Sequence, residues 1–154
     1  MPVFLIRHAH AGNRSGWRGE DAERPLSDRG HAQARGLVDL LGVRGIERIS
    51  SSPARRCIQT VEPLADALGL EVELDKRLAE GAPVRTALDV LLGAGTDHVL
   101  CAHGDLIPGL MHRLVTQGMR ATSPDRCQKG SVWEIELEGG RAVKARYRPP
   151  TRPA

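Results

Sequence analysis

The chain has 154 residues and a formal charge of +3, which is the length of one domain and enough to bury a core without disulfides. Its arginines are scattered and aromatic residues make up only 3% of the chain, which argues against a nucleic-acid-binding protein. No apolar run is long enough to cross a bilayer, so a membrane is not an expected partner either. A modest positive charge favours a small anionic substrate.

The three cysteines indicate a reducing compartment. Cys57, Cys101 and Cys127 are an odd number, widely separated, with no C-x-x-C pair. We interpret them as free thiols of an intracellular protein, two of them in the core. The first apolar run follows Met1 and Pro2 at once and is too short for a signal peptide, so we expect a cytoplasmic location.

The first predicted element is a short strand that leads directly into charged residues. Residues 3–6 are all apolar, which predicts a buried strand, and Arg7 and His8 follow it. Residues 13–24 are polar, contain glycine and form a long loop, and loops of this length are more often functional than idle. Ser27 is a good N-cap for a helix that ends at Gly42.

The same order of strand, polar residues and helix recurs along the chain. A strand at 46–51 precedes a helix at 54–68 that starts with Arg55 and Arg56, and a strand at 98–102 leads through His103 to a helix at 106–117. Between them, 71–74 is a weak strand, 75–83 is a loop containing Glu80, and 84–92 is a short helix. Residues 131–137 and 141–148 alternate around two glycines and predict a hairpin.

These elements predict an α/β fold, a three-layer sandwich with a mostly parallel central sheet flanked by helices and the C-terminal hairpin at the sheet edge. No internal boundary is visible, so we expect one domain over 1–148 and a tail over 149–154. In such folds ligands bind beyond the carboxyl ends of the parallel strands. Arg7, His8, Arg56 and His103 are therefore expected to converge at one edge of the sheet.

Two histidines and two arginines with a nearby glutamate fit phosphoryl transfer through a histidine nucleophile. Arginine forks neutralise and orient phosphoryl oxygens. One neutral histidine attacks phosphorus, the second donates a hydrogen bond to a phosphoryl oxygen, and a carboxylic acid protonates the leaving oxygen. The histidines lack the spacing of a metal site and no G-x-S-x-G motif exists, so neither a metal nor a serine nucleophile is indicated.

The residues also resemble the histidine phosphatase (phosphoglycerate-mutase-like) superfamily. The matching motifs, in chain order, are Leu5-Ile6-Arg7-His8-Ala9, the block Ser51-Ser52-Pro53 with Arg56 and Gln59-Thr60, and Ala102-His103-Gly104. The run Arg24-Pro25-Leu26-Ser27, followed by Gly30 and Gln33-Ala34, is similar to the small bacterial phosphohistidine phosphatases. The resemblance covers the chain from Val3 to about Leu114.

This resemblance implies a role for each site residue. His8 is the expected nucleophile, while Arg7, Arg56 and His103 form the phosphate pocket, and no metal or cofactor takes part. Glu80 is the expected proton donor, with Asp105 and Glu20 as competing candidates. In the 13–24 loop, Asn13 is a candidate substrate ligand, and Trp17 is a candidate cover for the site or part of a surface for a partner. His10 is expected to lie at the pocket edge or to be merely polar, and Arg55 to be solvated.

The expected activity is that of a phosphatase acting on a phosphomonoester or on phosphohistidine. The chain has no long insertion that could build a lid over the intermediate, so water should reach the phosphohistidine and hydrolysis should prevail over mutase activity. The expected substrate is a phosphate-bearing small molecule or a phosphoprotein, and the product is inorganic phosphate.

Two alternatives stay open. The chain is similar to the phosphatase domain that follows a Nudix domain in some actinobacterial housecleaning enzymes, which implies nucleotide or sugar phosphates as substrates. A module that binds phosphate or a phosphoprotein without turnover is the other alternative.

Overall fold

The computed structural model describes residues 2–95 and 97–151, and in that part of the chain the strands form a single sheet. In chain order the strands are β1 Pro2–Arg7, β2 Arg48–Ser51, β3 Val72–Leu74, β4 His98–Ala102, β5 Val132–Glu138 and β6 Arg141–Arg148. Their order across the sheet is β3-β2-β4-β1-β5-β6, and β1 to β4 run parallel while β5 and β6 pair antiparallel. This confirms the mostly parallel sheet with the C-terminal hairpin at its edge.

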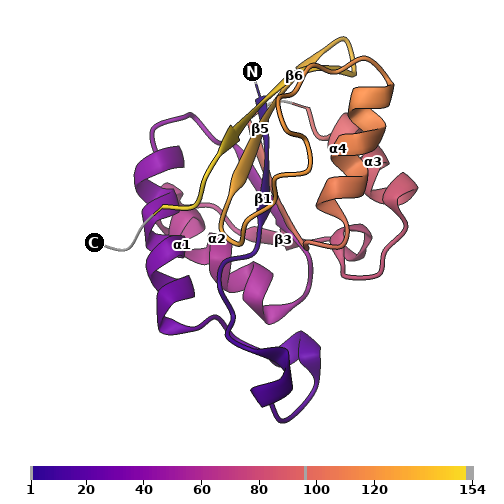
Figure 1. The fold of residues 1–154 in the computed structure, drawn as a ribbon. Coiled ribbons are helices and arrows are strands. Elements are labelled where there is room, and N and C mark those ends of the chain that lie inside the picture. The colour runs from indigo at the N-terminus through magenta and orange to yellow at the C-terminus, as the bar shows by residue number, and fades with distance from the viewer. Residues whose placement is uncertain (1, 96, 152–154) are drawn as a thin grey trace.

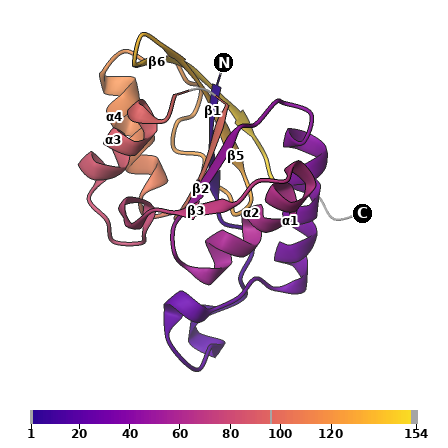
Figure 2. The ribbon, with the colours of Figure 1, turned by 180° about the vertical axis from the view of Figure 1, so that it is seen from behind.

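Helices cover both faces of the sheet (Figure 1). One face carries α1 Asp28–Leu41 and α2 Arg55–Leu68, and the other carries α3 Val84–Gly93 and α4 Ile107–Thr116, as the reverse view also shows (Figure 2). The alternation of β1 explains this, because Phe4 and Ile6 pack toward α1 and α2 whereas Val3 and Leu5 pack toward α3 and α4. The three-layer sandwich is therefore confirmed.

Some element boundaries differ from the sequence-based prediction. β2 begins at Arg48 rather than at residue 46, because pairing with β4 starts at Arg48 opposite His98, while Ile46 is already buried in the core. The following helix begins at Arg55, with Ala54 as an N-cap that makes no side-chain hydrogen bond. The helices predicted at 84–92 and 106–117 span Val84–Gly93 and Ile107–Thr116.

The loop between β1 and α1 is held tightly at its return to the fold. Ser27 is the N-cap of α1, as predicted, and its hydroxyl accepts a hydrogen bond from the Gly30 amide at 3.1 Å. The same hydroxyl lies 2.6 Å from Nδ1 of His10. A Cβ at Gly30 would come within 1.9 Å of the His10 carbonyl oxygen, so only glycine permits this contact between the loop and α1. His10 therefore anchors the loop.

The two 3₁₀ turns of this loop, Arg14–Gly16 and Asp21–Glu23, project beyond the end of the sheet (Figure 1). The start of the tail lies against α1, where the Thr151 hydroxyl donates to the Gln33 carbonyl at 3.3 Å. The rest of the tail, 152–154, lies outside the described residues. None of the described helices is long and apolar enough to cross a membrane.

Candidate active site

His8 is held in the orientation and protonation state that a nucleophile needs. Its amide donates to the Ala102 carbonyl at 3.1 Å, and its Nδ1 lies 2.8 Å from the Ala9 carbonyl oxygen. A carbonyl can only accept, so Nδ1 carries the proton and Nε2 keeps a free lone pair. Burial lowers the pKa of His8 to about 3, and the charges of Arg56 and Arg7 act in the same direction. His8 is therefore neutral at physiological pH.

Arg7 lies beside His8 at the end of β1, with its guanidinium held from the C-terminal part of the chain. One terminal nitrogen donates to the Cys127 carbonyl at 2.6 Å, while its buried Nε has no partner among the described residues. The amide of Gly130 donates to the carbonyls of Arg7 and His8, both at 3.1 Å. A Cβ at Gly104 would lie 2.5 Å from the guanidinium carbon of Arg7, so a larger residue there would displace the end of this side chain.

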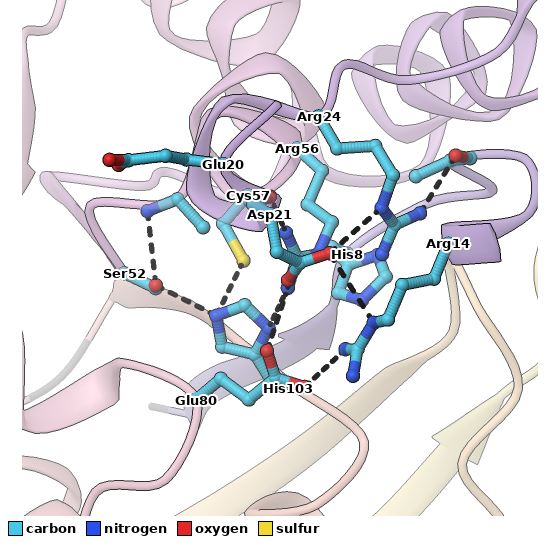
Figure 3. Close-up of polar contacts among 12 residues, drawn as sticks. His8, Arg14, Glu20, Asp21, Arg24, Ser52, Arg56, Cys57, Glu80 and His103 are labelled. Atoms are coloured by element: carbon cyan, nitrogen blue, oxygen red, sulfur yellow. Dashed lines mark hydrogen bonds and ion pairs between the residues drawn. The ribbon is translucent and has the colours of Figure 1, made fainter. Parts of the chain in front are cut away.

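His103 approaches His8 from the end of β4. The two imidazole rings meet edge to face with their centroids 5.4 Å apart. Nε2 of His103 lies 2.8 Å from the Ser52 hydroxyl, and Nδ1 lies 3.5 Å from a terminal nitrogen of Arg56 (Figure 3). When Ser52 donates to Nε2, Nδ1 carries the proton, and Nδ1 and Arg56 then present donors to the same point. An anion at that point would satisfy both.

Arg56 is the most buried cation of the site, with 1% of its surface exposed. It comes from the first turn of α2, and its Nε has no partner among the described residues. One terminal nitrogen donates to the Asp21 carbonyl at 2.8 Å, and the other contacts the carboxylates of Asp21 at 3.0 Å and of Glu80 at 3.1 Å. Arg55, by contrast, is exposed, as expected.

Of the three acid candidates, Glu80 and Asp105 lie at the site and Glu20 does not. Glu80 accepts a hydrogen bond from Arg14 at 2.6 Å in addition to its contact with Arg56. The Asp105 carboxylate accepts from the Gly81 amide at 2.8 Å and lines the same cavity as Glu80. The Glu20 side chain points away from the two imidazoles (Figure 3).

Asp21 faces the site although the sequence analysis did not single it out, whereas its neighbour Glu20 does not face the site. Its carboxylate contacts Arg14 at 3.3 Å, Arg24 at 3.1 Å and Arg56 at 3.0 Å. Burial would raise the pKa of Asp21, but the hydrogen bond from Arg24 and the charges of Arg56 and Arg14 outweigh it and lower the pKa below its usual value. The only sequence signal was the spacing of Asp21 and Arg24 within the loop.

A cavity of about 300 Å³ opens over His8. Asn13, the candidate substrate ligand, lines it, and its side-chain oxygen accepts from the Ser15 amide at 3.2 Å. The lining residues are Arg7, His8, Gly12, Asn13, Arg14, Arg24, Glu80, His103, Gly104, Asp105 and Lys129. An adjoining cavity of about 320 Å³ shares Glu80 and His103 and adds Asp21, Ser52 and Arg56. Arg7, His8, Arg56, His103 and Glu80 thus all line these two adjoining cavities.

The donor atoms at this site suit an anion rather than a metal ion. Arg7, Arg24, Arg56 and Lys129 surround the two histidines. Within residues 2–95 and 97–151, no group of three or more histidine, cysteine or carboxylate side chains is placed to hold a metal ion. Cys57 and Cys101 are buried free thiols, as predicted, and the Cys57 sulfur lies 3.5 Å from Nε2 of His103.

A sequence model of the histidine phosphatase superfamily (branch 1) matches residues 3–86. That span is more than half of the chain and contains the segments that carry Arg7, His8, Arg56 and Glu80. The chain therefore belongs to the histidine phosphatase superfamily.

Curated relatives are similar over different lengths. The chain is 34% identical over 154 aligned positions to an 8-oxo-(d)GTP phosphatase of Mycolicibacterium smegmatis, covering 96% of this chain and 48% of that protein. It is 33% identical over 85 positions to a probable phosphoglycerate mutase, GpmB, of an Enterobacter species, covering 52% of this chain and 38% of that protein. The chain thus spans about half, or less, of the length of these relatives.

Solved structures share the fold across the whole chain. The protein histidine phosphatase SixA complexed with tungstate superposes with a TM-score of 0.76 at 23% identity, covering 99% of this chain and 97% of that one. A mycobacterial glucosyl-3-phosphoglycerate phosphatase complexed with VO3 gives a TM-score of 0.72 at 21% identity, covering 95% and 96%. The chain has the fold of the SixA-like branch of the superfamily.

Proposed function

We propose that the chain is a phosphatase that works without a metal ion, through a covalent phosphohistidine on His8. The observation that carries this proposal is that the neutral His8 lines a cavity together with Arg7, while Arg56 lines the adjoining cavity, which shares Glu80 and His103 with the first. Each of these arginines has a buried Nε without a partner in the described structure. Because these two atoms are buried, it is the terminal nitrogens of the two guanidinium groups that would donate to a bound phosphoryl group.

The first step is in-line attack of His8 Nε2 on phosphorus. The N–P bond forms as the bond from phosphorus to the leaving oxygen breaks, and the leaving oxygen takes a proton from a carboxylic acid. Arg7, Arg56 and Nδ1–H of His103 donate to the phosphoryl oxygens and stabilise the charge of the transition state. In the second step water attacks phosphorus, the carboxylate recovers its proton, and inorganic phosphate leaves His8.

Glu80 is the proposed proton donor. It lines both cavities, which also share His103. It would therefore lie beside the phosphoryl group and face solvent. Its carboxylate contacts Arg14 at 2.6 Å and Arg56 at 3.1 Å. Phosphoryl binding would engage Arg56 and so release Glu80 from one of its two partners.

The substrate class is a separate proposal. The printed name of the Mycolicibacterium smegmatis relative favours a nucleotide, whereas that of the SixA structure favours phosphohistidine in a protein. A phosphate-binding module without turnover is disfavoured by the intact pair of His8 and His103. The activity, the metal independence and a cytoplasmic location remain our proposals.

The decisive experiment traps the intermediate. The protein is incubated with p-nitrophenyl phosphate in a chelator, quenched, and examined by intact mass and peptide mapping. We expect turnover and one phosphoryl group on His8, and we expect both to be lost in His8→Ala and retained in His112→Ala, which alters an exposed histidine on α4. Turnover by His8→Ala would refute the mechanism, and turnover abolished by the chelator would refute metal independence.

A further inference from the structure

A second hollow adjoins the His8 cavity. It has a volume of about 320 Å³ and is lined by Ala11, Gly12, Asn13, Gly16, Trp17, Arg24, Pro25, Leu26 and Ser27. Gly12, Asn13 and Arg24 also line the His8 cavity, so the two spaces share a rim. Each space is at the lower end of the volumes, about 300 to 1,000 Å³, that hold small molecules. We call this second space the Trp17 hollow.

Trp17 gives the hollow an aromatic wall in an otherwise polar loop. The indole N–H donates to the Glu20 carbonyl at 2.9 Å, which fixes the ring and uses its only hydrogen-bonding group. Trp17 therefore contributes ring surface rather than a polar contact. Pro25 and the buried Leu26 add apolar surface. A half-buried ring with these neighbours suits a flat ring system stacked against it.

The shared rim is polar, which suits a ligand whose charged part lies between the two spaces. The Asn13 side-chain oxygen is occupied by the Ser15 amide, which leaves the side-chain amide hydrogens for a ligand. Lys129 lines the His8 cavity and forms no ion pair with any described carboxylate. Burial and the nearby charges of Arg7, Arg24 and Arg29 lower the pKa of Lys129. A cation without a carboxylate partner at this place favours a ligand with more than one anionic group.

We propose that the Trp17 hollow binds the base of a nucleotide whose terminal phosphoryl group occupies the His8 cavity. This inference rests on the proposed phosphatase activity and names its substrate class. The base stacks on Trp17, the ribose crosses the rim at Gly12 and Asn13, and the phosphate preceding the terminal one lies near Lys129 and Arg24. Recognition of a whole phosphoprotein is a different case, because a specific protein–protein interface buries roughly 800 Å² of surface on each partner.

The kinetic test compares substrates with and without a ring. The values of kcat/KM are measured for ADP, GDP and glycerol phosphate in the wild type, in Trp17→Ala and in Ser15→Ala, a matched change at an exposed position of the same loop. We expect the nucleotides to be preferred, and Trp17→Ala to lower their kcat/KM about tenfold, mainly through KM, as the loss of one base–aromatic stack does. Glycerol phosphate should be unaffected by Trp17→Ala, and Ser15→Ala should resemble the wild type.

A binding measurement separates this inference from the phosphatase activity. Trp17 and the buried Trp133 are the only tryptophans, so quenching of fluorescence by GDP in the wild type and its absence in Trp17→Phe would locate the base even in an inactive protein. Hydrolysis of glycerol phosphate as efficient as that of GDP, with no quenching, would overturn the nucleotide site and leave the phosphatase intact. The nucleotide site would also be overturned if Trp17→Ala lowered kcat/KM for a phosphohistidine protein more than for any nucleotide. Quenching without any hydrolysis would overturn the phosphatase alone.

Discussion

The carboxylate of Asp21 lies 3.0 Å from a terminal nitrogen of Arg56, the nitrogen that Glu80 also contacts at 3.1 Å. Two carboxylates from separate loops therefore share the cation that the proposed mechanism assigns to the phosphoryl group. In the proposed mechanism a substrate must therefore compete with Asp21 and Glu80 for Arg56, and we expect this competition to weaken substrate binding.

Asp21→Asn should tighten the binding of phosphate. The neutral amide leaves Arg56, Arg24 and Arg14 with less compensation, so an anion gains more by binding among them. We expect the dissociation constant for inorganic phosphate or vanadate to fall about tenfold and the free energy of unfolding without ligand to fall by about 1 kcal/mol. Calorimetric titration and urea unfolding measure both. Weaker phosphate binding in this variant would show that Asp21 instead orders the loop for the ligand.

Arg56→Lys should impair catalysis although it keeps the charge. A lysine cannot reproduce the planar fork that contacts the Asp21 carbonyl and the site at once. We expect kcat/KM to fall at least about a hundredfold, the size of effect seen when a transition-state donor is lost. The exposed neighbour Arg55 provides the control, and Arg55→Lys should keep full activity. Equal activity of the two variants would remove Arg56 from the phosphate pocket.

Gly104→Ala should displace the guanidinium of Arg7. The new methyl group would lie 2.5 Å from the guanidinium carbon, so the side chain must move away from its contact with Cys127. We expect kcat to fall about tenfold to a hundredfold and stability to fall by about 1 to 3 kcal/mol. Gly93→Ala is the matched control, because nothing lies within 4 Å of the added methyl group there. Unchanged kinetics in Gly104→Ala would mean that Arg7 does not need its present position.

His8 should make the protein less stable as the pH falls below about 6.5. Its pKa is about 3 in the folded protein and 6.5 in the unfolded chain, so between these values only the unfolded chain gains a proton. The free energy of unfolding should therefore drop by about 1.4 kcal/mol per pH unit from this group, and the contribution is fully present above pH 6.5. Urea unfolding at several pH values, in the wild type and in His8→Gln, isolates it. If the free energy of unfolding depended on pH in the same way in both proteins, His8 would not be a buried neutral imidazole.

The sequence alone predicted the positions of those site residues that lie at strand ends or at the start of a helix. Arg7 and His103 sit next to strand ends and Arg56 is in the first turn of α2, and a parallel sheet gathers these positions at one edge. The loop residues were harder. Glu20 and Asp21 are adjacent acids, and only the 3₁₀ turn that begins at Asp21 decides which carboxylate faces Arg56. Such turns leave no periodic signal in the sequence.

The contacts of residues 127–131 with Arg7 also bear on how the protein is made. Arg7 and His8 are synthesised more than a hundred residues before the Cys127 carbonyl, the Gly130 amide and the Ser131 carbonyl that hold them in place. β1 itself stays unpaired on one side until β5 exists. The order of synthesis therefore separates the motifs from the site they build, because Arg7 and His8 gain their final hydrogen bonds only when residues 127–138 have folded back onto β1.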